Sequence, residues 1–362
     1  MFGSLRTTLA LMVMVHHLFL PDALGPYAVF GFYILSGYLM TLIMHESYGF
    51  HKAGRINFAI NRVLRLFPMY WVAAVFSLVL IYMIGGEAVK QYHRSMFIPS
   101  DVKSILENVF MIFPGWRSDE INPRLVPTTW ALTVEMFFYL MICVGASKNI
   151  FRVKVWFLAS LAYVGLTFYI GGSTADRYFP IAAASLPFSI GGLLYFFSKS
   201  VKNRSLFLKS KLSTNKLFAT MIINVMIWIL AKHVLKLGEI AELGFYLNLV
   251  ICSALIFSII LGGRLALIGK RADKFIGELS YPIYLMQWQV GLLVSVLLFG
   301  HPLHEFSILG LWSLAVSVVT VIGLSIGMIF LVDRPVQTVR EKIKANNVPN
   351  PTGVPLRSTM SG

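Results

Sequence analysis

Ten apolar segments, separated by polar stretches, constrain this chain more than any other feature of its sequence. They occupy residues 4–20, 27–46, 67–84, 128–146, 154–170, 178–198, 217–236, 243–261, 278–299 and 307–332. Each is close to the roughly 20 residues that a helix needs to cross a bilayer. Hydrophobic residues make up 57% of the chain and charged residues only 13%, whereas soluble domains have about 25% charged residues. We therefore predict an all-α, polytopic transmembrane bundle of about ten spanning helices.

The basic residues predict the orientation of these helices. If the N-terminus is cytoplasmic, 23 of the 31 Lys and Arg residues lie in or beside cytoplasmic segments. Cytoplasmic loops of membrane proteins are enriched in Lys and Arg, so we predict two cytoplasmic termini and an extracytoplasmic loop at 85–127. The net charge of +15 then reflects contact with anionic lipids and requires no nucleic-acid partner. We predict one transmembrane domain, residues 1–344, and a disordered cytoplasmic tail, residues 345–362.

Ionisable side chains within the apolar segments mark candidate sites, because a charge in the hydrocarbon layer costs at least about 2.5 kcal/mol. Arg6 and His17 are eleven positions apart, so an α-helix places them on one face with about 16 Å of rise between them. His16 points about 100° away. A histidine can titrate near neutral pH, which makes His17 a candidate general base. Alternatively, His17 bonds a neighbouring helix and Arg6 anchors the chain at the membrane surface.

Glu135 is an acidic residue within the fourth apolar segment. It lies about 10 Å from the outer end of that segment, and His17 lies about 5 Å from the same surface. These similar depths allow the two side chains to meet. A carboxylate beside an imidazole fixes its tautomer and raises its basicity, so Glu135 is the candidate to orient His17 or to act as the base itself. The alternative is a structural hydrogen bond or a neutral carboxyl group.

Arg62 and Arg65 are three residues apart and share one side of a helix at the predicted cytoplasmic boundary. Their guanidinium groups suit phosphate binding, but contact with lipid headgroups explains them equally well. Tyr70 and Trp130 fit an aromatic belt at least as well as a site. The glycine that follows Ser36 fits close helix packing. We predict no metal site.

Five motifs in order make the sequence similar to acyltransferase family 3, the bacterial membrane acyltransferases that modify carbohydrates, from about residue 5 to residue 336. The motifs are Arg6 with His17, Ala28–Leu39 (AVFGFYILSGYL), Arg62 and Arg65 with Pro68 and Tyr70, Trp130–Tyr139 (WALTVEMFFY), and Ser280–Trp288 (SYPIYLMQW) with Asp333–Pro335. Two positions depart from the family pattern. Phe30 replaces an aspartate, and Gln287 replaces a histidine that is often found there.

The resemblance implies transfer of an acyl group, often acetyl, from cytoplasmic acyl-coenzyme A to a hydroxyl of a cell-surface or exported glycan, in the bacterial inner membrane. Acyl-coenzyme A would be a co-substrate, with no permanently bound cofactor, and the acceptor a glycan or lipid-linked glycan. Together with the geometry above, it predicts donor binding by Arg6, Arg62 and Arg65, and catalysis by His17 and Glu135. The further site candidates are Ser36, Tyr70, Trp130, Tyr139, Tyr281 and Gln287.

Two other classes of function fit a polytopic bundle. The chain could be a transporter or flippase of a glycan or small molecule, because intramembrane charge also marks ion and substrate pathways. Inverted repeats and broken helices would favour a transporter, and the sequence shows neither. It could instead be a non-catalytic membrane scaffold, but a scaffold would not explain ionisable residues that share a helix face.

Overall fold

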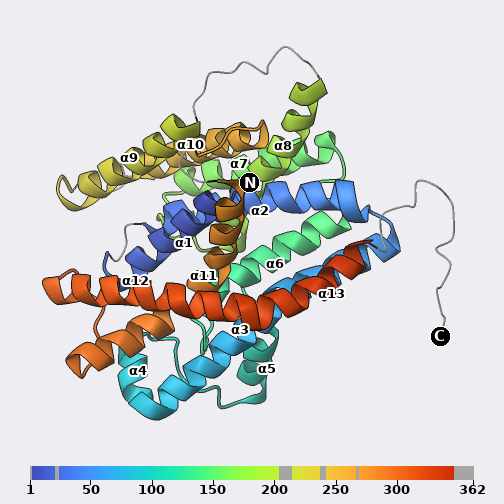
Figure 1. Cartoon of the computed structure of the whole chain (residues 1–362). Helices are drawn as coiled ribbons and strands as arrows, with labels where there is room; N and C mark the ends of the chain where they lie inside the picture. The colour runs from blue at the N-terminus through green and yellow to red at the C-terminus, as the bar shows by residue number, and fades with distance from the viewer. Residues whose placement is uncertain (1, 21–23, 204–213, 237–241, 266–268, 346–362) are drawn as a thin grey trace, which may run out of the picture.

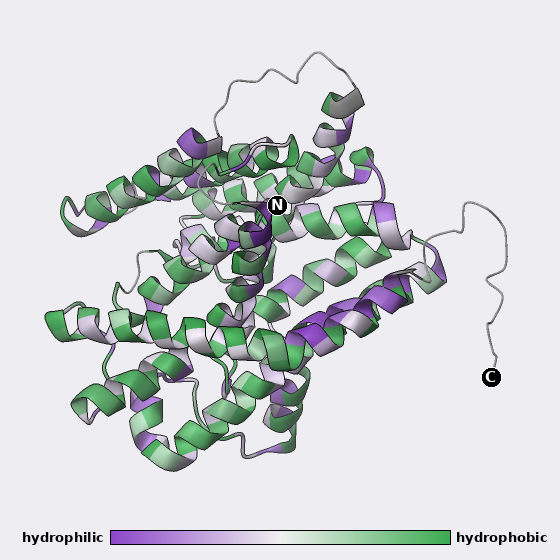
Figure 2. Cartoon of the chain, viewed as in Figure 1, coloured by the Kyte–Doolittle hydropathy of each residue, from purple (hydrophilic) through white to green (hydrophobic). Residues whose placement is uncertain are grey.

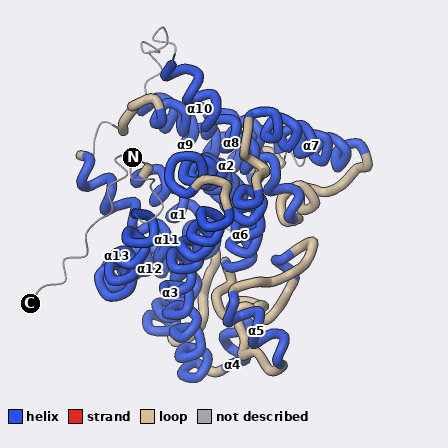
Figure 3. Tube along the Cα trace, turned by 90° about the vertical axis from the view of Figure 1, so that its right-hand side faces the viewer, coloured by secondary structure: helices blue, strands red, loops and turns tan. Residues whose placement is uncertain are grey.

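A computed structural model describes residues 2–20, 24–203, 214–236, 242–265 and 269–345 of the 362-residue chain. Within these residues the regular secondary structure is all helical, without a β-strand (Figures 1 and 3). The α-helices are α1 (Gly3–Leu18), α2 (Gly25–Ile43), α3 (Lys52–Ile84), α4 (Gly86–Tyr92), α5 (Val102–Phe110), α6 (Thr129–Val144), α7 (Ile150–Tyr169), α8 (Ile181–Asn203), α9 (Thr214–His233), α10 (Glu242–Ile260), α11 (Lys270–Phe299), α12 (Ile308–Met328) and α13 (Arg334–Ala345). The predicted all-α fold is confirmed. The predicted disordered tail lies, apart from Ala345, outside the described residues.

Each of the ten predicted apolar segments coincides with a helix. Eight helical segments in the described ranges are long and apolar enough to cross a membrane, and they contain α2, α3 and α7 to α12. The remaining two segments are α1 and α6, which have 16 residues each. Such helices are about 24 Å long, which is shorter than the hydrocarbon core of roughly 30 Å. Figure 2 shows hydrophobic residues along the long helices and a mostly hydrophilic α13. The chain is a polytopic helical membrane bundle.

Helix α1 packs along α11, and α2 packs along α8. Two glycines allow the second contact. A Cβ atom at Gly37 would lie 2.2 Å from the carbonyl oxygen of Phe188, and one at Gly191 would lie 2.2 Å from that of Ile34. Small residues let membrane helices approach closely, so the interpretation of the glycine after Ser36 is confirmed.

The two ends of the described chain lie at the same end of the bundle. The carboxylate of Asp273, in the first turn of α11, accepts hydrogen bonds from the backbone N–H groups of Gly3 and Ser4 at 3.2 and 2.8 Å. Helix α13 packs against α3, where the side-chain amide of Asn61 donates to the carbonyl oxygen of Arg340 at 3.1 Å. A chain that starts and finishes at one end crosses the bundle an even number of times, as expected for ten spans.

We name the two ends of the bundle after two residues of helix α1. Arg6 lies in its first turn, beside the start of α11, and His17 lies in its last turn. We call these the arginine end and the histidine end. The helical rise separates the two residues by about 16 Å.

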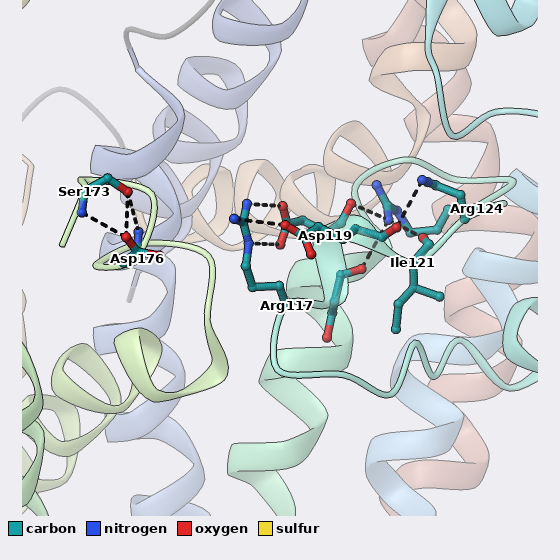
Figure 4. A network of polar contacts seen from close by, with 9 residues as sticks. Arg117, Asp119, Ile121, Arg124, Ser173 and Asp176 are labelled. Atoms are coloured by element: carbon teal, nitrogen blue, oxygen red, sulfur yellow. Dashed lines mark hydrogen bonds and ion pairs between the residues drawn. The ribbon is translucent and has the colours of Figure 1, made fainter. Parts of the chain in front are cut away.

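The long segment 85–127 is structured and contains α4, α5 and the short 3-10 helix η2 (Ser118–Glu120). Buried Arg124 organises its second half (Figure 4) by donating to the carbonyl oxygens of Asp119 and Pro127 at 2.8 and 3.2 Å, among others. The Asp119 carboxylate in turn pairs with Arg117 at 3.0 Å. Figure 4 also shows the neighbouring loop between α7 and α8, where hydrogen bonds from Ser173 lower the pKa of Asp176.

Residues 108–113 of this segment reach into the bundle. The hydroxyl of Tyr70 donates to the carbonyl oxygen of Asn108, and Tyr70 precedes the end of α3 by about 21 Å. The hydroxyl of Thr133 in α6 donates to the carbonyl oxygen of Met111 at 3.1 Å and accepts from the N–H of Phe113 at 3.2 Å. Non-helical backbone at membrane depth requires such protein partners, because lipid offers none.

Cysteine labelling tests the predicted orientation. The native residues Cys143 and Cys252 are buried, so a single cysteine introduced at an exposed position in a loop or near the end of a helix gives the signal. Cysteines at Lys148 and Lys199 are expected to react in intact cells only with membrane-permeant reagents, and a cysteine at Glu120 is expected to react with impermeant ones. The opposite pattern would place the arginine end outside the cell and contradict the orientation predicted from loop charge.

Candidate active site

A cavity of about 450 Å³ lies at the arginine end, between α1, α2, α3, α6 and α11, with α13 at its edge. Charged side chains of both signs line this cavity. The basic ones are Arg6, Arg62, Arg65, Lys274 and Arg340, and the acidic ones are Glu135, Asp273, Glu278 and Asp333. The cavity therefore brings together the three arginines that the sequence predicted to bind a donor.

The three predicted arginines differ in the hydrogen-bond and ion-pair partners that the protein offers them. Arg65 pairs with Asp333, with 2.8 Å between nitrogen and oxygen. Arg62 donates from Nη2 to the side-chain oxygen of Asn61 at 2.7 Å, but its buried Nε has no hydrogen-bond partner among the described residues. For Arg6, no hydrogen bond or ion pair of the guanidinium group is found within the described part of the chain, although the carboxylates of Glu135 and Asp333 attract it. A cation removed from water without an acceptor is unfavourable, so this cavity suits an anionic ligand.

Glu135 lies among these arginines. One carboxylate oxygen accepts hydrogen bonds from the hydroxyls of Ser36 and Tyr139, the latter at 2.5 Å, and the carboxylate interacts electrostatically with Arg6 and Arg62. Three predicted site residues, from α2 and α6, therefore form one hydrogen-bonded group within the cavity. Its charge partly balances the cations around it.

Aromatic rings line the cavity on the side of the histidine end. Phe32 and Tyr284 line it, with ring centroids 6.1 Å apart. Gln287 follows Tyr284 by one turn of α11 and lies beside His17. His17 itself does not line the cavity. It therefore lies about one helical turn beyond Tyr284.

His17 belongs to a cluster of rings around Trp288, which we call the histidine cluster. The ring centroids of His17, His93 and His304 lie 4.9, 4.4 and 5.5 Å from that of Trp288. His93 comes from the segment after α4, and His304 from the loop between α11 and α12. The buried Nδ1 of His17 has no hydrogen-bond partner within the described chain. The two loops thus meet over the end of α1.

The remaining predicted candidates divide into two groups. Tyr281 lines the cavity, donates to the carbonyl oxygen of Leu66 at 2.8 Å, and has the guanidinium of Arg65 5.6 Å from its ring centroid. Tyr70 and Trp130 do not line the cavity. Tyr70 is fully buried against the segment that contains Asn108, and Trp130 packs on aromatic residues of the loop between α7 and α8. The contacts of Tyr70 and Trp130 give them roles in packing.

The expected meeting of His17 and Glu135 is not found. Glu135 bonds Ser36 and Tyr139, whereas His17 lies against Trp288 at the other end. The depth estimate was wrong because it placed the start of α6 at the membrane surface. Thr128, immediately before α6, exchanges hydrogen bonds of 3.2 Å with Tyr284, which is already one turn inside Gln287. Seven further residues carry Glu135 about 10 Å towards the arginine end.

Sequence reasoning missed five charged residues that line the cavity: Asp273, Lys274, Glu278, Asp333 and Arg340. One available signal was periodicity, because Asp333 and Arg340 are seven residues apart and a helix places such residues on nearly the same face. Asp333 was recognised as part of a closing motif, without a role. Lys274 and Arg340 also fit the positive charge expected of cytoplasmic segments, which hides their place in the cavity.

The fold and the site define a class, namely polytopic membrane proteins with a cationic cavity inside the helical bundle. The chain matches the family model described as an acyltransferase domain over residues 3–328, and it therefore belongs to acyltransferase family 3. No curated protein and no solved structure matches the chain significantly. The protein is a multi-pass membrane acyltransferase.

Proposed function

We propose that this acyltransferase moves an acyl group, most simply acetyl, from coenzyme A to a hydroxyl of a glycan. The observation that carries the proposal is the cavity, which begins among Arg6, Arg62 and Arg65 and ends one helical turn short of His17. A donor with phosphates at one end and a thioester at the other fits such a cavity. The arginine end would receive it from the cytoplasm, in agreement with the positive-inside rule.

Charge and length both support coenzyme A as the donor. Guanidinium groups bind phosphate oxygens through two parallel hydrogen bonds, and Arg6 and Arg62 have donors that protein acceptors leave unused. The rise of α1 from Arg6 to His17 is about 16 Å. An extended pantetheine arm can span that distance, which would bring the thioester towards the histidine cluster while the phosphates stay with the arginines.

His17 supplies the base in this reaction. A glycan hydroxyl is a weak nucleophile at neutral pH, so its proton must leave as its oxygen attacks the thioester carbonyl. The oxygen forms a bond to the carbonyl carbon while His17 accepts the proton. The carbon–sulfur bond then breaks, and the departing thiolate of coenzyme A takes that proton from His17. The products are the acylated glycan and the free thiol of coenzyme A.

A reconstituted assay tests the proposal as a whole. The purified protein in proteoliposomes would receive acetyl-coenzyme A on one side and a candidate glycan on the other, with release of free thiol and mass spectrometry of the glycan as readouts. We expect thiol release that depends on the glycan and one added acyl group per thiol. Movement of unmodified glycan across the bilayer without thiol release would instead indicate a transporter or flippase.

Substitution of the arginines tests donor binding separately. Arg65→Lys keeps the charge but loses the planar fork, so we expect weaker binding of acyl-coenzyme A by about 1–3 kcal/mol, the value of a hydrogen bond to a charged group. Arg6→Ala and Arg62→Ala should weaken binding as well. Isothermal titration of the folded variants measures these changes. Unchanged affinity in all three would mean that these arginines do not bind the donor.

A further inference from the structure

Arg340 is a cavity residue that lies outside the family match, which ends at residue 328. It comes from α13, the amphipathic helix that follows the last span. Its Nε donates to the side-chain oxygen of Asn61 at 3.4 Å, and Arg62 donates to the same oxygen at 2.7 Å. Two guanidinium groups from helices far apart in sequence therefore share one neutral acceptor.

The arginines of this cavity have more N–H donors than the acceptors that the described residues offer them. Among the described residues, the acceptor found for the guanidinium groups of both Arg62 and Arg340 is the single oxygen of Asn61, apart from a weak contact of Arg62 with the sulfur of Met40. Asp333, the acidic residue that interacts electrostatically with Arg340, pairs with Arg65. A guanidinium group has five N–H donors. Arg62 and Arg340 thus retain donors for an anion.

Arg340 and Arg6 occupy different levels of the cavity. Arg6 lies on α1 within the bundle, near Glu135. Arg340 lies on a helix whose outer face, including Val339 and Lys342, is exposed. The cationic lining therefore has an inner level at Arg6 and an outer level at Arg340, and Arg65 interacts electrostatically with both.

We infer that Arg340 binds the 3′-phosphate of coenzyme A. This inference rests on the proposed function, which places the thioester towards His17. In coenzyme A the pyrophosphate follows the pantetheine arm, and the 3′-phosphate on the ribose lies farther still from the sulfur. The order of phosphates along the donor then matches the order of cations, with the pyrophosphate at Arg6 and Arg62 and the 3′-phosphate at Arg340. Arg340 selects coenzyme A over a donor that lacks this phosphate.

Binding of two ligands to matched variants tests the assignment. Isothermal titration would compare coenzyme A with 3′-dephospho-coenzyme A for the full-length wild-type protein, Arg340→Gln and Lys342→Gln in detergent. Lys342→Gln removes one positive charge from the same helix, but on a face turned about 200° away. We expect Arg340→Gln to bind coenzyme A roughly tenfold or more weakly, as for a lost hydrogen bond to a charged group. It should bind the dephospho ligand like the wild type, and Lys342→Gln should change neither affinity.

Other outcomes separate the inference from the proposed function. Equal weakening for both ligands would place Arg340 at the inner phosphates, and unchanged affinity for both would limit it to docking α13, so either result overturns the inference alone. Failure of the wild type to bind coenzyme A would overturn the proposed function. A folding defect could also weaken binding, and Arg340→Lys controls for it because it keeps the positive charge. The backbone carbonyl that accepts from Asn61 remains in every variant. Arg340→Lys should recover part of the preference for coenzyme A.

Discussion

His17→Ala is expected to lower the rate of glycan acylation by about 10²–10⁴-fold, the usual contribution of a general base. Affinity for acyl-coenzyme A should stay largely unchanged, because His17 does not line the cavity that contains the arginines. Single-turnover measurements of acylated glycan, together with titration of the donor, separate the two effects.

His16→Ala is the matched control for this experiment. Its ring centroid lies 5.0 Å from that of His17, but the side chain leaves the helix about 100° away. We expect a milder loss of rate. Near-normal turnover in folded His17→Ala protein would refute the proposed role of His17 while leaving the family assignment intact.

Glu242→Gln is expected to destabilise the protein by roughly 3–5 kcal/mol, because it removes one partner of a buried ion pair. Glu242 in α10 pairs with Arg177, which precedes α8, at 2.6 Å, and their side chains are 4% and 2% exposed. The amide keeps the shape but removes the carboxylate charge that faces the buried guanidinium group. The midpoint of thermal unfolding in detergent should fall by several degrees.

Glu120→Gln provides the comparison for that loss. Glu120 pairs with Arg117 at 2.9 Å, but its side chain is 58% exposed. Exposed ion pairs contribute about 0–1 kcal/mol, so its unfolding midpoint should hardly change. Equal midpoints for the two variants would mean that the buried pair contributes no more than the exposed one.

The helices of this bundle could be predicted because a bilayer imposes a length and a composition on each span. All ten apolar segments became helices, and the shared face of Arg6 and His17 follows from helical geometry alone. The arginine group was also foreseen. Arg62 and Arg65 are three residues apart, and the structure places both on the wall of the cavity beside Arg6.

The place of Glu135 could not be predicted because it depends on where α6 begins. That point is set by Thr128 and Tyr284, which are 156 positions apart in the chain and bond each other within the bundle. Segment 85–127 also enters the bundle at residues 108–113, although its prolines and charges resemble those of an ordinary outside loop. No local pattern contains these contacts between distant parts of the chain.

Arg65 already has a carboxylate partner, Asp333, before any donor arrives. A phosphate that binds Arg65 in the proposed reaction must share or displace this carboxylate, so the net gain is a difference between two charge-assisted interactions. Spent coenzyme A has the same phosphates as the acylated donor, and its affinity is reduced equally. Product release limits many enzymes, and tighter phosphate binding would retain the product as firmly as the substrate. In the proposed reaction the ion pair would therefore lower the affinity for the donor and speed the departure of the free thiol, so that the cavity can be refilled.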